Sequence, residues 1–587
     1  MPTLSWLGKK KIVNHHLDVP FHVLDKKYKF ESKVECKNNS TDNRIIHGDN
    51  LAVLKSLLPE FEGKVDCIYI DPPYNTGNEK WVYNDNVNDP RIKKWLNTVV
   101  GKEGDDLSRH DKWLCMIYPR LKLLYKLLAE NGVIFISIDD NEQANLKLVC
   151  DEIFGSKNCI GPIIQNKLNS KNDTLNVQKN HEFIFIYGKA IDSSKSQLLT
   201  NHSNDIKKVF EENGRYYFLN DPITTRGEGG TLNARQNLGY TVYYNPNTKE
   251  KLAVCDYDIN LAKISNDETL IYSTNDDLVA QGYVPIRPPK VRNKLGAWTW
   301  DLKKFNDEKD NIVILGKKGT YSVRKRTFIN NEEVFLENGD YYFKRVNISN
   351  SKSILEFSTN EGTKTLAEIM GTSEGFDNPK NVELIEYLLG LLNKKNALVL
   401  DSFAGSGTTA HAVLRLNQRD DGNRRFILCE MMDYAETITA ERVRRVMDGY
   451  GEGKTKNEGL GGSFEYFELG EPLFLENELL NESVGIERIR QYVSYSERIP
   501  LDQQLPITNN ISPSALGVNE QTLWLFNYDE NAVTSLDLDF LGSLNLRELT
   551  QRPSQYVIYA DKCVLETKFM QDHGITFKRI PRDILRF

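Results

Sequence analysis

The sequence predicts an α/β protein whose main sheet is parallel and covered by helices on both faces. Five short apolar runs rich in β-branched residues have the length of buried strands, at 65–70, 133–138, 183–187, 398–400 and 426–429. Apolar residues at helical spacing lie next to most of these runs, at 51–58, 118–128 and 410–416. Continuous apolar strands that alternate with helices are typical of parallel sheets buried on both faces.

The length and composition indicate a globular protein with several domains. A single hydrophobic core stops growing at roughly 250–300 residues, and this chain has 587. Hydrophobic residues make up 40% and charged residues 27% of the chain, which excludes an intrinsically disordered protein. The formal net charge is −7, so any surface that binds nucleic acid has to be a local one.

The cysteines and the apolar runs exclude further classes of protein. Eight cysteines occur without any CxxC spacing, which argues against a zinc ribbon or a disulfide scaffold. The sequence shows no cluster of metal ligands, and we expect no metal. No apolar run approaches the ~20 residues of a membrane-spanning helix, and the first residues lack an apolar signal core. We therefore expect a cytoplasmic protein that does not interact with membranes.

Changes in composition along the chain predict six segments. The strand and helix patterns fall into two blocks, and the segment between them is rich in Asn, Gly, Thr and Tyr. Turn signals such as Glu337-Asn338-Gly339-Asp340 predict hairpins in that segment. The predicted segments are an N-terminal extension (1–40), the first block of the main domain (41–190), a large mixed α+β insert (191–375), the second block (376–450), a linker (451–463) and a small C-terminal α/β domain (464–587).

A tetrapeptide with distinctive chemistry follows the first apolar strand. Residues 65–70 run directly into Asp71-Pro72-Pro73-Tyr74, and open α/β sheets bind their ligands at the carboxyl ends of strands. The prolines lack N–H donors and stiffen the turn, which leaves carbonyl oxygens as acceptors. A carboxylate beside a fixed carbonyl suits an exocyclic amino group, and the Tyr74 ring offers a face for stacking a planar base. The alternative is a rigid turn with a solvated Asp.

A loop of small residues follows the strand at 398–400 and precedes a helix. It reads Asp401-Ser402-Phe403-Ala404-Gly405-Ser406-Gly407-Thr408. Glycines allow close approach of the backbone to a ligand, and the first N–H groups of a helix attract a carboxylate or phosphate. Glu430 ends the next strand, where it is placed to accept hydrogen bonds from ribose hydroxyls. Alone, this pattern also fits a dehydrogenase, but hydride transfer has no use for Asp-Pro-Pro-Tyr.

Together, the two motifs resemble those of the amino-directed DNA methyltransferases that use S-adenosylmethionine. Asp71-Pro72-Pro73-Tyr74 resembles their catalytic motif, and residues 401–407 resemble their cofactor loop. The catalytic motif comes first in the chain, which is the circularly permuted order called the β group. Residues 45–50 resemble the loop whose Asp, here Asp49, approaches the cofactor adenine. Residues 376–380 resemble the helix start that packs at the methionine end of the cofactor.

The resemblance implies a Rossmann-like, S-adenosylmethionine-dependent methyltransferase sheet and a set of site residues. The implied catalytic residues are Asp71, Pro72, Pro73 and Tyr74. The implied cofactor-binding residues are Asp49, Asn378, Lys380, Asp401, Phe403, Ala404, Gly405, Ser406, Gly407, Thr408 and Glu430. Asp at the first position of the tetrapeptide favours N6 of a flipped-out adenine over cytosine N4. His181 and Glu182 are interpreted as a strand-edge feature, because the reaction needs no third acid–base group.

The chain length, the run Asp71–Gly77 and the large insert most resemble the modification subunit of a Type III restriction-modification system. This resemblance implies that the insert recognises the target in double-stranded DNA and that the C-terminal domain forms a homodimer. It also implies a restriction (helicase/nuclease) subunit as a candidate partner. The alternatives are an orphan or other-system methyltransferase, methylation of RNA or a protein amide, and a nucleotide-dependent DNA-binding module without transfer.

A basic window lies within the insert. Residues 287–326 contain twelve Lys or Arg and four Asp or Glu, a local balance of +8, together with Trp298, Trp300 and Tyr321. Basic residues among aromatic ones are what a nucleic-acid surface requires, although a solvated loop face is the alternative. The predicted DNA-binding residues are Arg287, Lys290, Arg292, Lys294, Arg324, Lys325 and Arg326.

Overall fold

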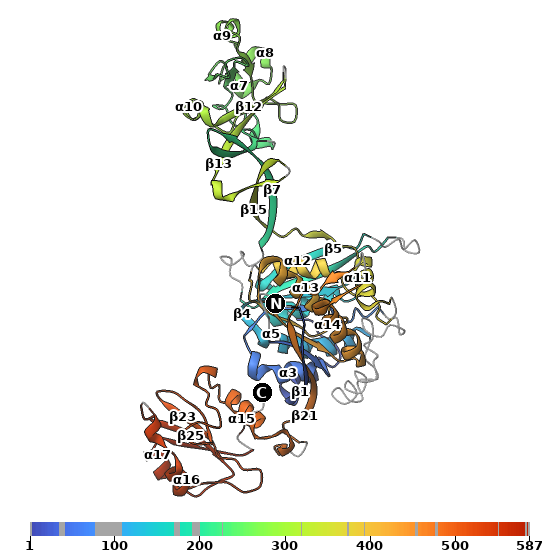
Figure 1. The fold of residues 1–587 in the computed structure, drawn as a ribbon, viewed down its shortest axis with the longest axis vertical. Coiled ribbons are helices and arrows are strands. Elements are labelled where there is room, and N and C mark those ends of the chain that lie inside the picture. The colour runs from blue at the N-terminus through green and yellow to red at the C-terminus, as the bar shows by residue number, and fades with distance from the viewer. Residues whose placement is uncertain are drawn as a thin grey trace. The chain divides into compact units, whose positions relative to one another are not determined.

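Figure 1 shows the computed structural model of the chain, which contains two compact units. The first unit is formed by Met1–Asn201 together with Asn350–Phe587, and the second by His202–Ser349. The structure describes residues 3–34, 42–76, 109–168, 177–190, 200–225, 227–317, 320–337, 339–372, 375–392, 394–451, 456–475, 479–549, 551–581 and 584.

A ten-stranded mixed sheet forms the centre of the first unit. Its strands lie in the order β1 (His22–Glu31), β21 (Ser463–Pro472), β2 (Asn43–His47), β18 (Arg425–Glu430), β17 (Leu398–Asp401), β3 (Val65–Ile70), β4 (Leu128–Ile138), β6 (His181–Gly188), β5 (Cys159–Asn166) and β16 (Ile354–Glu356). The neighbours from β21 to β4 are all parallel. The prediction of a parallel sheet is therefore confirmed for its centre.

The flanks of the sheet depart from that prediction. β1 is antiparallel to β21, and β6 is antiparallel to both β4 and β5. β6 therefore runs opposite to both of its neighbours, whereas β4 and β5 run in the same direction. The expectation of a wholly parallel sheet is wrong at these positions, because an apolar run by itself carries no information about strand direction.

Helices cover both faces of the sheet. On one face, α3 (Asn50–Phe61), α5 (Arg109–Leu127) and α6 (Gln143–Cys150) share a core with Ile68 and Ile70 of β3. On the other face, α11 (Asn360–Met370), α12 (Val382–Gly390), α13 (Thr408–Asp420) and α14 (Glu441–Asp448) share a core with Cys67 and Tyr69. Successive side chains of a strand point to opposite faces, so β3 supplies both cores, and the predicted two-sided arrangement is confirmed.

The ends of the chain also contribute to this sheet. The N-terminal segment contains α1 (Lys9–Ile12), α2 (His15–Asp18) and the edge strand β1. β21 lies between β1 and β2 and buries Phe464 and Tyr466 in the main core. The boundary between the main domain and the C-terminal domain thus falls after Pro472, later than the sequence indicated. The short strands β19 (Gly449–Tyr450) and β20 (Asn457–Glu458) pair within the glycine-rich segment, of which 452–455 lie outside the described residues.

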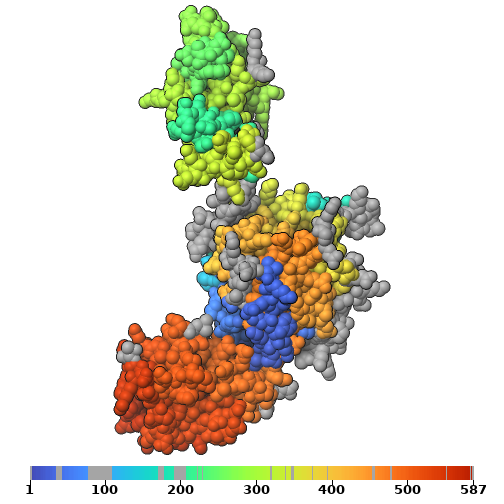
Figure 2. Space-filling view, viewed as in Figure 1, coloured from blue at the N-terminus to red at the C-terminus, as the bar shows by residue number. Residues whose placement is uncertain are grey.

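The part of the chain after β21 forms a small α/β domain with its own cores, coloured orange to red in Figures 1 and 2. Its sheet has the order β22 (Ala515–Val518), β23 (Thr522–Phe526), β25 (Gln555–Ala560) and β27 (Ile575–Arg579). The other elements are α15 (Ile486–Ser496), α16 (Leu538–Ser543), α17 (Thr567–Asp572) and the two-stranded pair of β24 (Ser535–Leu536) and β26 (Lys562–Cys563).

The second unit, His202–Ser349, is mainly β. One sheet has the order β12 (Ile312–Lys317), β13 (Thr320–Ile329), β8 (Arg215–Pro222), β7 (Thr200–Glu212), β15 (Asp340–Asn350) and β14 (Val334–Glu337). A three-stranded sheet has the order β10 (Lys251–Val254), β9 (Thr241–Tyr244) and β11 (Val284–Ile286). The helices are short: α7 (Leu261–Ile264), α8 (Glu268–Ile271), α9 (Asp276–Ala280) and α10 (Leu302–Asp307). β16 and α11, which follow this unit in the chain, belong to the first unit.

Within the described ranges, no helix combines the length and the apolar character that crossing a bilayer requires.

Candidate active site

The two motif loops meet because their strands are neighbours. β17 pairs with β3 in parallel, with Val399 opposite Cys67 and Leu400 opposite Ile68. Parallel strands end at the same edge of a sheet, so the turn after β3 and the loop after β17 open towards each other. One cleft is lined by Tyr69, Asp71, Phe376, Asn378, Pro379, Lys380, Asp401, Phe403, Ala404, Gly405, Ser406, Thr408 and Thr409. The prediction that Asp71 and Gly405 line a shared cleft is confirmed.

The glycine loop has a backbone conformation that other residues rarely adopt. Gly405 and Gly407 have φ angles of 53° and 78°. A Cβ atom on Gly407 would lie 3.1 Å from the carbonyl oxygen of Thr439. The left-handed conformation and the close backbone approach both explain why glycine stands at these positions. Gly407 is also the N-cap residue of α13, so the helix begins where the loop ends.

Buried side chains from other elements hold this loop. Glu430 accepts a hydrogen bond from Gly405 N at 2.8 Å, and Thr439 Oγ1 donates to Gly405 O at 2.5 Å. Arg442 is fully buried, and its Nη1 donates to Ser406 Oγ and Thr408 Oγ1, each at 2.7 Å. Burial lowers the pKa of Arg442 to about 9. The sequence analysis missed Thr439 and Arg442, since neither belongs to a motif.

The carboxylates of Asp401 and Asp49 both accept hydrogen bonds from nearby groups of the chain, at the carboxyl ends of β17 and β2. Asp401 accepts hydrogen bonds from Phe403 N at 3.0 Å and from Thr409 Oγ1 at 2.5 Å. Burial raises the pKa of Asp401 to about 7. Asp49 is the N-cap residue of α3 and accepts from Leu51 N at 3.0 Å. Their predicted contacts with a cofactor stay predictions.

The Asp-Pro-Pro-Tyr turn after β3 is buried and held by a neighbouring helix. Trp113 Nε1 donates to the carbonyl oxygen of Pro73 at 2.6 Å and fixes the turn against α5. The side chain of Asp71 is 10% exposed. Its Oδ1 receives no well-aligned hydrogen bond from the described residues. A buried carboxylate oxygen that faces a cleft without such a donor is suited to accept one from a ligand.

A cluster of opposite charges surrounds Asp71. Lys380 Nζ lies 3.2 Å from Asp71 Oδ1 and 2.8 Å from Glu182 Oε2. Lys167 Nζ lies 2.6 Å from Glu182 Oε1, and Tyr74 Oη donates to Glu182 Oε2 at 3.1 Å. Glu182 is therefore part of the site, and its interpretation as a strand-edge feature is wrong. Its chain neighbour His181 faces Asp140 instead, at 3.6 Å.

The cluster has consequences for ionisation. Burial raises the pKa of Asp71 above its usual range, against the opposing effect of the Lys380 ammonium. Burial would also raise the pKa of Glu182, but the Lys380 and Lys167 ammonium groups outweigh it and hold that pKa at about 2. Burial disfavours charge on Lys380, yet Asp71 and Glu182 together raise its pKa. The carboxylate of Glu182 and the ammonium of Lys380 are thus stable charges, whereas Asp71 is the more basic carboxylate.

Comparison with known proteins identifies the family. Residues 65–498 match the family model described as DNA methylase. The chain belongs to the DNA methylase family. The resemblance that the two motifs predicted is thereby confirmed.

Three proteins show what this chain is similar to. The EcoPI Mod subunit of a Type III restriction-modification enzyme, from Escherichia phage P1, is 34% identical over 72% of this chain and 62% of its own length. The Type II methyltransferase M.KpnI of Klebsiella pneumoniae is 31% identical over 68% of this chain and 83% of its own. The EcoP15I Mod subunit of Escherichia coli is 29% identical over 73% and 64%. The chain therefore spans less than two thirds of the two Mod subunits.

Four of the predicted DNA-binding residues contact other side chains or the backbone of the second unit. Arg287 pairs with Glu268 at 2.9 Å, and Arg326 pairs with Glu212. Arg324 donates to the carbonyl oxygen of Asn220, and Lys325 lies 5.6 Å from the centre of the Trp300 ring. These four side chains make contacts within the second unit.

Lys290 and Arg292 follow Arg287 in the chain, and Lys290 Nζ lies 3.5 Å from the same Glu268 that pairs with Arg287. They line a cavity of about 430 Å³ together with Thr224, Thr225 and Tyr321. Lys294 closes the tight turn that starts at Val291. Trp298 also borders the cavity, but it is only 1% exposed and donates to Tyr240 O at 2.7 Å. Trp298 is thus a core residue and not an exposed aromatic surface.

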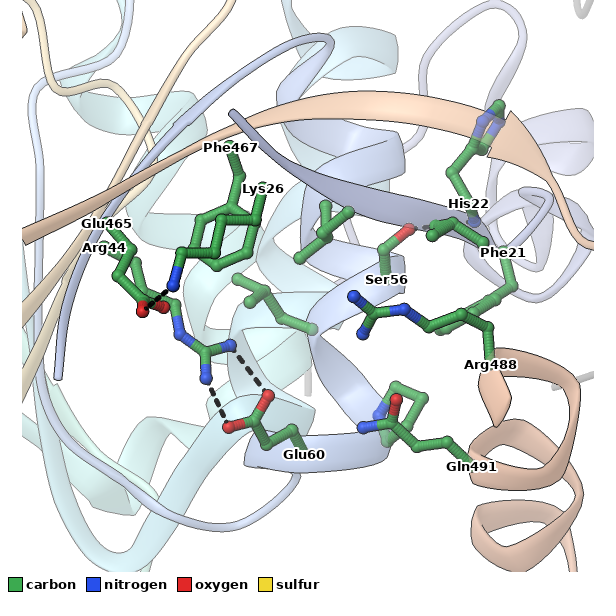
Figure 3. Close-up of a pocket in the computed structure, with 14 residues that line it drawn as sticks. Phe21, His22, Lys26, Arg44, Ser56, Glu60, Glu465, Phe467, Arg488 and Gln491 are labelled. Carbon is green, nitrogen blue, oxygen red and sulfur yellow. Dashed lines mark hydrogen bonds and ion pairs between the residues drawn. The ribbon is translucent and has the colours of Figure 1, made fainter. Parts of the chain in front are cut away.

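A second cavity of the first unit, of about 240 Å³, has a different character (Figure 3). It lies between β1, β2 and β21 on one side and α3 and α15 on the other. Its charges are largely paired within the wall, as Arg44 with Glu60 and Lys26 with Glu465 (Figure 3). It contains no motif residue. Among the described residues, no group of three His, Cys, Asp or Glu side chains is arranged to hold a metal ion.

The support that Arg442 gives to the glycine loop can be tested. Replacing Arg442 with Met removes the donor to Ser406 and Thr408 while keeping side-chain length. We expect the affinity for S-adenosylmethionine to fall roughly tenfold or more, because charge-assisted hydrogen bonds contribute about 1.5–3 kcal/mol. Calorimetric titration measures this. The matched control is Arg419→Met, since Arg419 is an exposed residue of α13. Equal affinity in both variants would contradict the role of Arg442.

Proposed function

We propose that the chain transfers a methyl group from S-adenosylmethionine to N6 of a flipped-out adenine in double-stranded DNA. The observation that carries this proposal is the shared cleft of Asp71 and the Gly405 loop. Membership of the DNA methylase family and the similarity to Type III Mod subunits support it. We take the order of the two motifs as the circularly permuted arrangement of the β group.

The residues of the cleft fit the proposed cofactor. S-adenosylmethionine supplies an activated methyl group on a sulfonium. The positive φ angles of Gly405 and Gly407 open the loop to a ligand, and Gly407 begins α13, where N–H groups favour a carboxylate. Phe376 and Asn378 border the same cleft. Glu430 is the last residue of β18 and Asp49 follows the adjacent strand β2, where hydroxyl and adenine groups would meet them.

Asp71 and Pro72 would activate the target amine. The N6 lone pair is delocalised into the ring, which makes the amine a poor nucleophile. Hydrogen bonds to the Asp71 carboxylate and the Pro72 carbonyl oxygen favour a tetrahedral nitrogen and localise the lone pair. The N6–carbon bond forms as the sulfur–carbon bond breaks, and the bonding electron pair stays on sulfur. The released N6 proton passes to Asp71, whose raised pKa suits an acceptor.

The base has to leave the duplex to reach this turn. Tyr74 lies next to Asp71 in the chain, and we propose that its ring stacks on the flipped base. Asp71 rather than Ser at the first motif position favours adenine, and cytosine N4 is the second candidate.

The catalytic proposal makes a direct prediction for Asp71→Ala. The variant should lose methyl transfer by at least about a thousandfold and keep its affinity for S-adenosylmethionine, because the missing carboxylate acts on the amine. Transfer is measured with labelled cofactor and methyl-free amplified DNA, followed by nucleoside analysis. Asp25→Ala, at an exposed residue of β1, is the control. Loss of cofactor affinity with retained transfer would contradict the assignment, and N4-methylcytosine as product would contradict the choice of base.

We further propose that the second unit contacts DNA at the cavity bordered by Lys290 and Arg292. Both side chains line this cavity, and Lys290 Nζ also lies 3.5 Å from Glu268 Oε2. Cationic side chains that neutralise phosphates release counterions and supply affinity that does not depend on sequence. Thr224, Thr225 and Tyr321 offer hydroxyl groups beside them for polar contacts with DNA.

The double variant Lys290→Gln/Arg292→Gln tests this surface. It should bind DNA more weakly and reduce the slope of log affinity against log salt concentration by up to about 2. Fluorescence anisotropy at several salt concentrations measures both effects. Lys249→Gln/Lys263→Gln removes the same charge from exposed positions of the same unit and is the control. An unchanged slope in the first variant would show that the window is a solvated face.

The system in which the enzyme works is also a proposal. We infer that the chain is the modification and specificity subunit of a Type III-like system, with a second copy and a restriction subunit as partners. We place the association of two copies in the domain that follows β21. Sedimentation of the full chain should then give the mass of a dimer, and a monomer at micromolar concentration would contradict this part of the proposal.

A further inference from the structure

Lys380 occupies the place that the proposed target amine requires. Its ammonium lies 3.2 Å from Asp71 Oδ1 and 4.8 Å from the centre of the Tyr74 ring. It also donates to Tyr74 Oη at 2.5 Å. The same carboxylate oxygen has to accept the amine, and the same ring has to stack on the base. The ammonium must therefore give way when the base binds.

The Lys380 ammonium is held less tightly by Asp71 than by Glu182, so another donor can replace it at Asp71. The ammonium approaches Asp71 Oδ1 at ion-pair distance but without the alignment of a hydrogen bond. Its contact with Glu182 Oε2 is shorter, at 2.8 Å, and is a hydrogen bond. Glu182 is itself anchored, because Lys167 holds its other oxygen at 2.6 Å.

Burial makes the counter-ion necessary. The side chain of Lys380 is only 12% exposed. A buried ammonium that loses its partner carries a large desolvation penalty. If Asp71 were its only carboxylate, binding of the amine would leave this charge unpaired. With Glu182 present, Lys380 keeps one carboxylate throughout.

We propose that Glu182 is a positioning residue that retains the Lys380 ammonium, so that the target amine can replace it at Asp71. The inference rests on the proposed function. Glu182 touches neither the reacting atoms nor the base in this role, and it acts through Lys380. The four charged residues come from different elements of the first unit. Asp71 follows β3, and Lys167 follows β5. Glu182 lies in β6, and Lys380 lies just before α12.

The charged groups that act on Asp71 are limited in number. Burial raises the pKa of Asp71 most strongly, the Lys380 ammonium lowers it, and the Glu182 carboxylate raises it. The Asp71 carboxylate in turn contributes to the raised pKa of Tyr69 within β3 and of Asp401 at the end of β17, after the larger effect of burial. The Lys167 ammonium lowers the pKa of Glu182. Activity requires Asp71 as a carboxylate, so the acid limb of the pH–rate profile follows its pKa.

Glu182→Gln is the main test, in single-turnover transfer from saturating S-adenosylmethionine to methyl-free amplified DNA. The plateau rate should fall roughly ten- to a hundredfold, because Lys380 then has no carboxylate other than Asp71. The acid limb should move to lower pH, since a negative charge beside Asp71 has been removed. Lys380→Met removes a positive charge and should move the limb to higher pH.

The double variant Glu182→Gln/Lys380→Met separates positioning from a merely structural role. It should transfer faster than Glu182→Gln, because no ammonium then competes for Asp71. A double variant that is as slow as, or slower than, Glu182→Gln would overturn the proposal. Glu182→Asp keeps the charge and should retain more of the rate than Glu182→Gln. If the Gln variant fails to fold, Glu182→Asp and the double variant Glu182→Asp/Lys380→Met replace the Gln pair in the same comparison of rates.

Controls distinguish the inference from the function on which it rests. Glu356→Gln changes an exposed residue of β16 in the same sheet and should leave rate and pH profile unchanged. Calorimetry with S-adenosylmethionine and circular dichroism report cofactor binding and folding of each variant. A wild-type chain without transfer refutes the proposed function. A wild-type chain with transfer, and a folded Glu182→Gln variant of equal plateau rate, refutes only the role of Glu182.

Discussion

The parallel pairing of β17 with β3 is the interaction on which the site depends. The two strands are separated by more than 300 residues of chain, counted from Ile70 to Leu398, and they meet through short ladders such as Leu400 opposite Ile68. Asp66 of β3 strengthens the junction, because its carboxylate accepts from Leu398 N at 2.9 Å and from Lys394 Nζ at 2.7 Å. Once these strands are adjacent, the rigid Asp-Pro-Pro-Tyr turn and the glycine loop necessarily open into one cleft.

That junction could be predicted because each half is a local pattern. An apolar strand followed by Asp71-Pro72-Pro73-Tyr74, and another followed by Gly405 and Gly407, can be recognised within a dozen residues. The two-sided burial of the sheet was predictable for the same reason, since β3 is apolar on both of its faces. Strand direction was not, because β6 has the same apolar character as the parallel strands at the centre of the sheet, yet it runs against β4.

The supporting residues could not be predicted, since they reach the site through tertiary packing. Arg442 lies in α14, beyond the loop that it supports, and Glu182 enters from an antiparallel strand. Their sequence neighbourhoods look like an ordinary amphipathic helix and an ordinary strand. The signal available in the sequence for Glu182 was a charged residue directly beside the apolar run 183–187. Trp298 is the opposite case. Its place in a basic window indicated a binding surface, but its indole N–H donates to Tyr240 O and the residue belongs to the core.

The charge cluster also explains how a buried carboxylate can serve as both acceptor and base. Asp71 and Glu182 are balanced by Lys380 and Lys167, so the formal charge of the four groups is zero. In the proposed exchange, a neutral amine replaces an ammonium that remains bound to Glu182, and this balance does not change. Binding of the base therefore needs no new charge in a low-dielectric site. In the proposed reaction, a proton on Asp71 would leave the cluster with one excess positive charge, which would favour release of that proton. The same carboxylate is then again available as an acceptor.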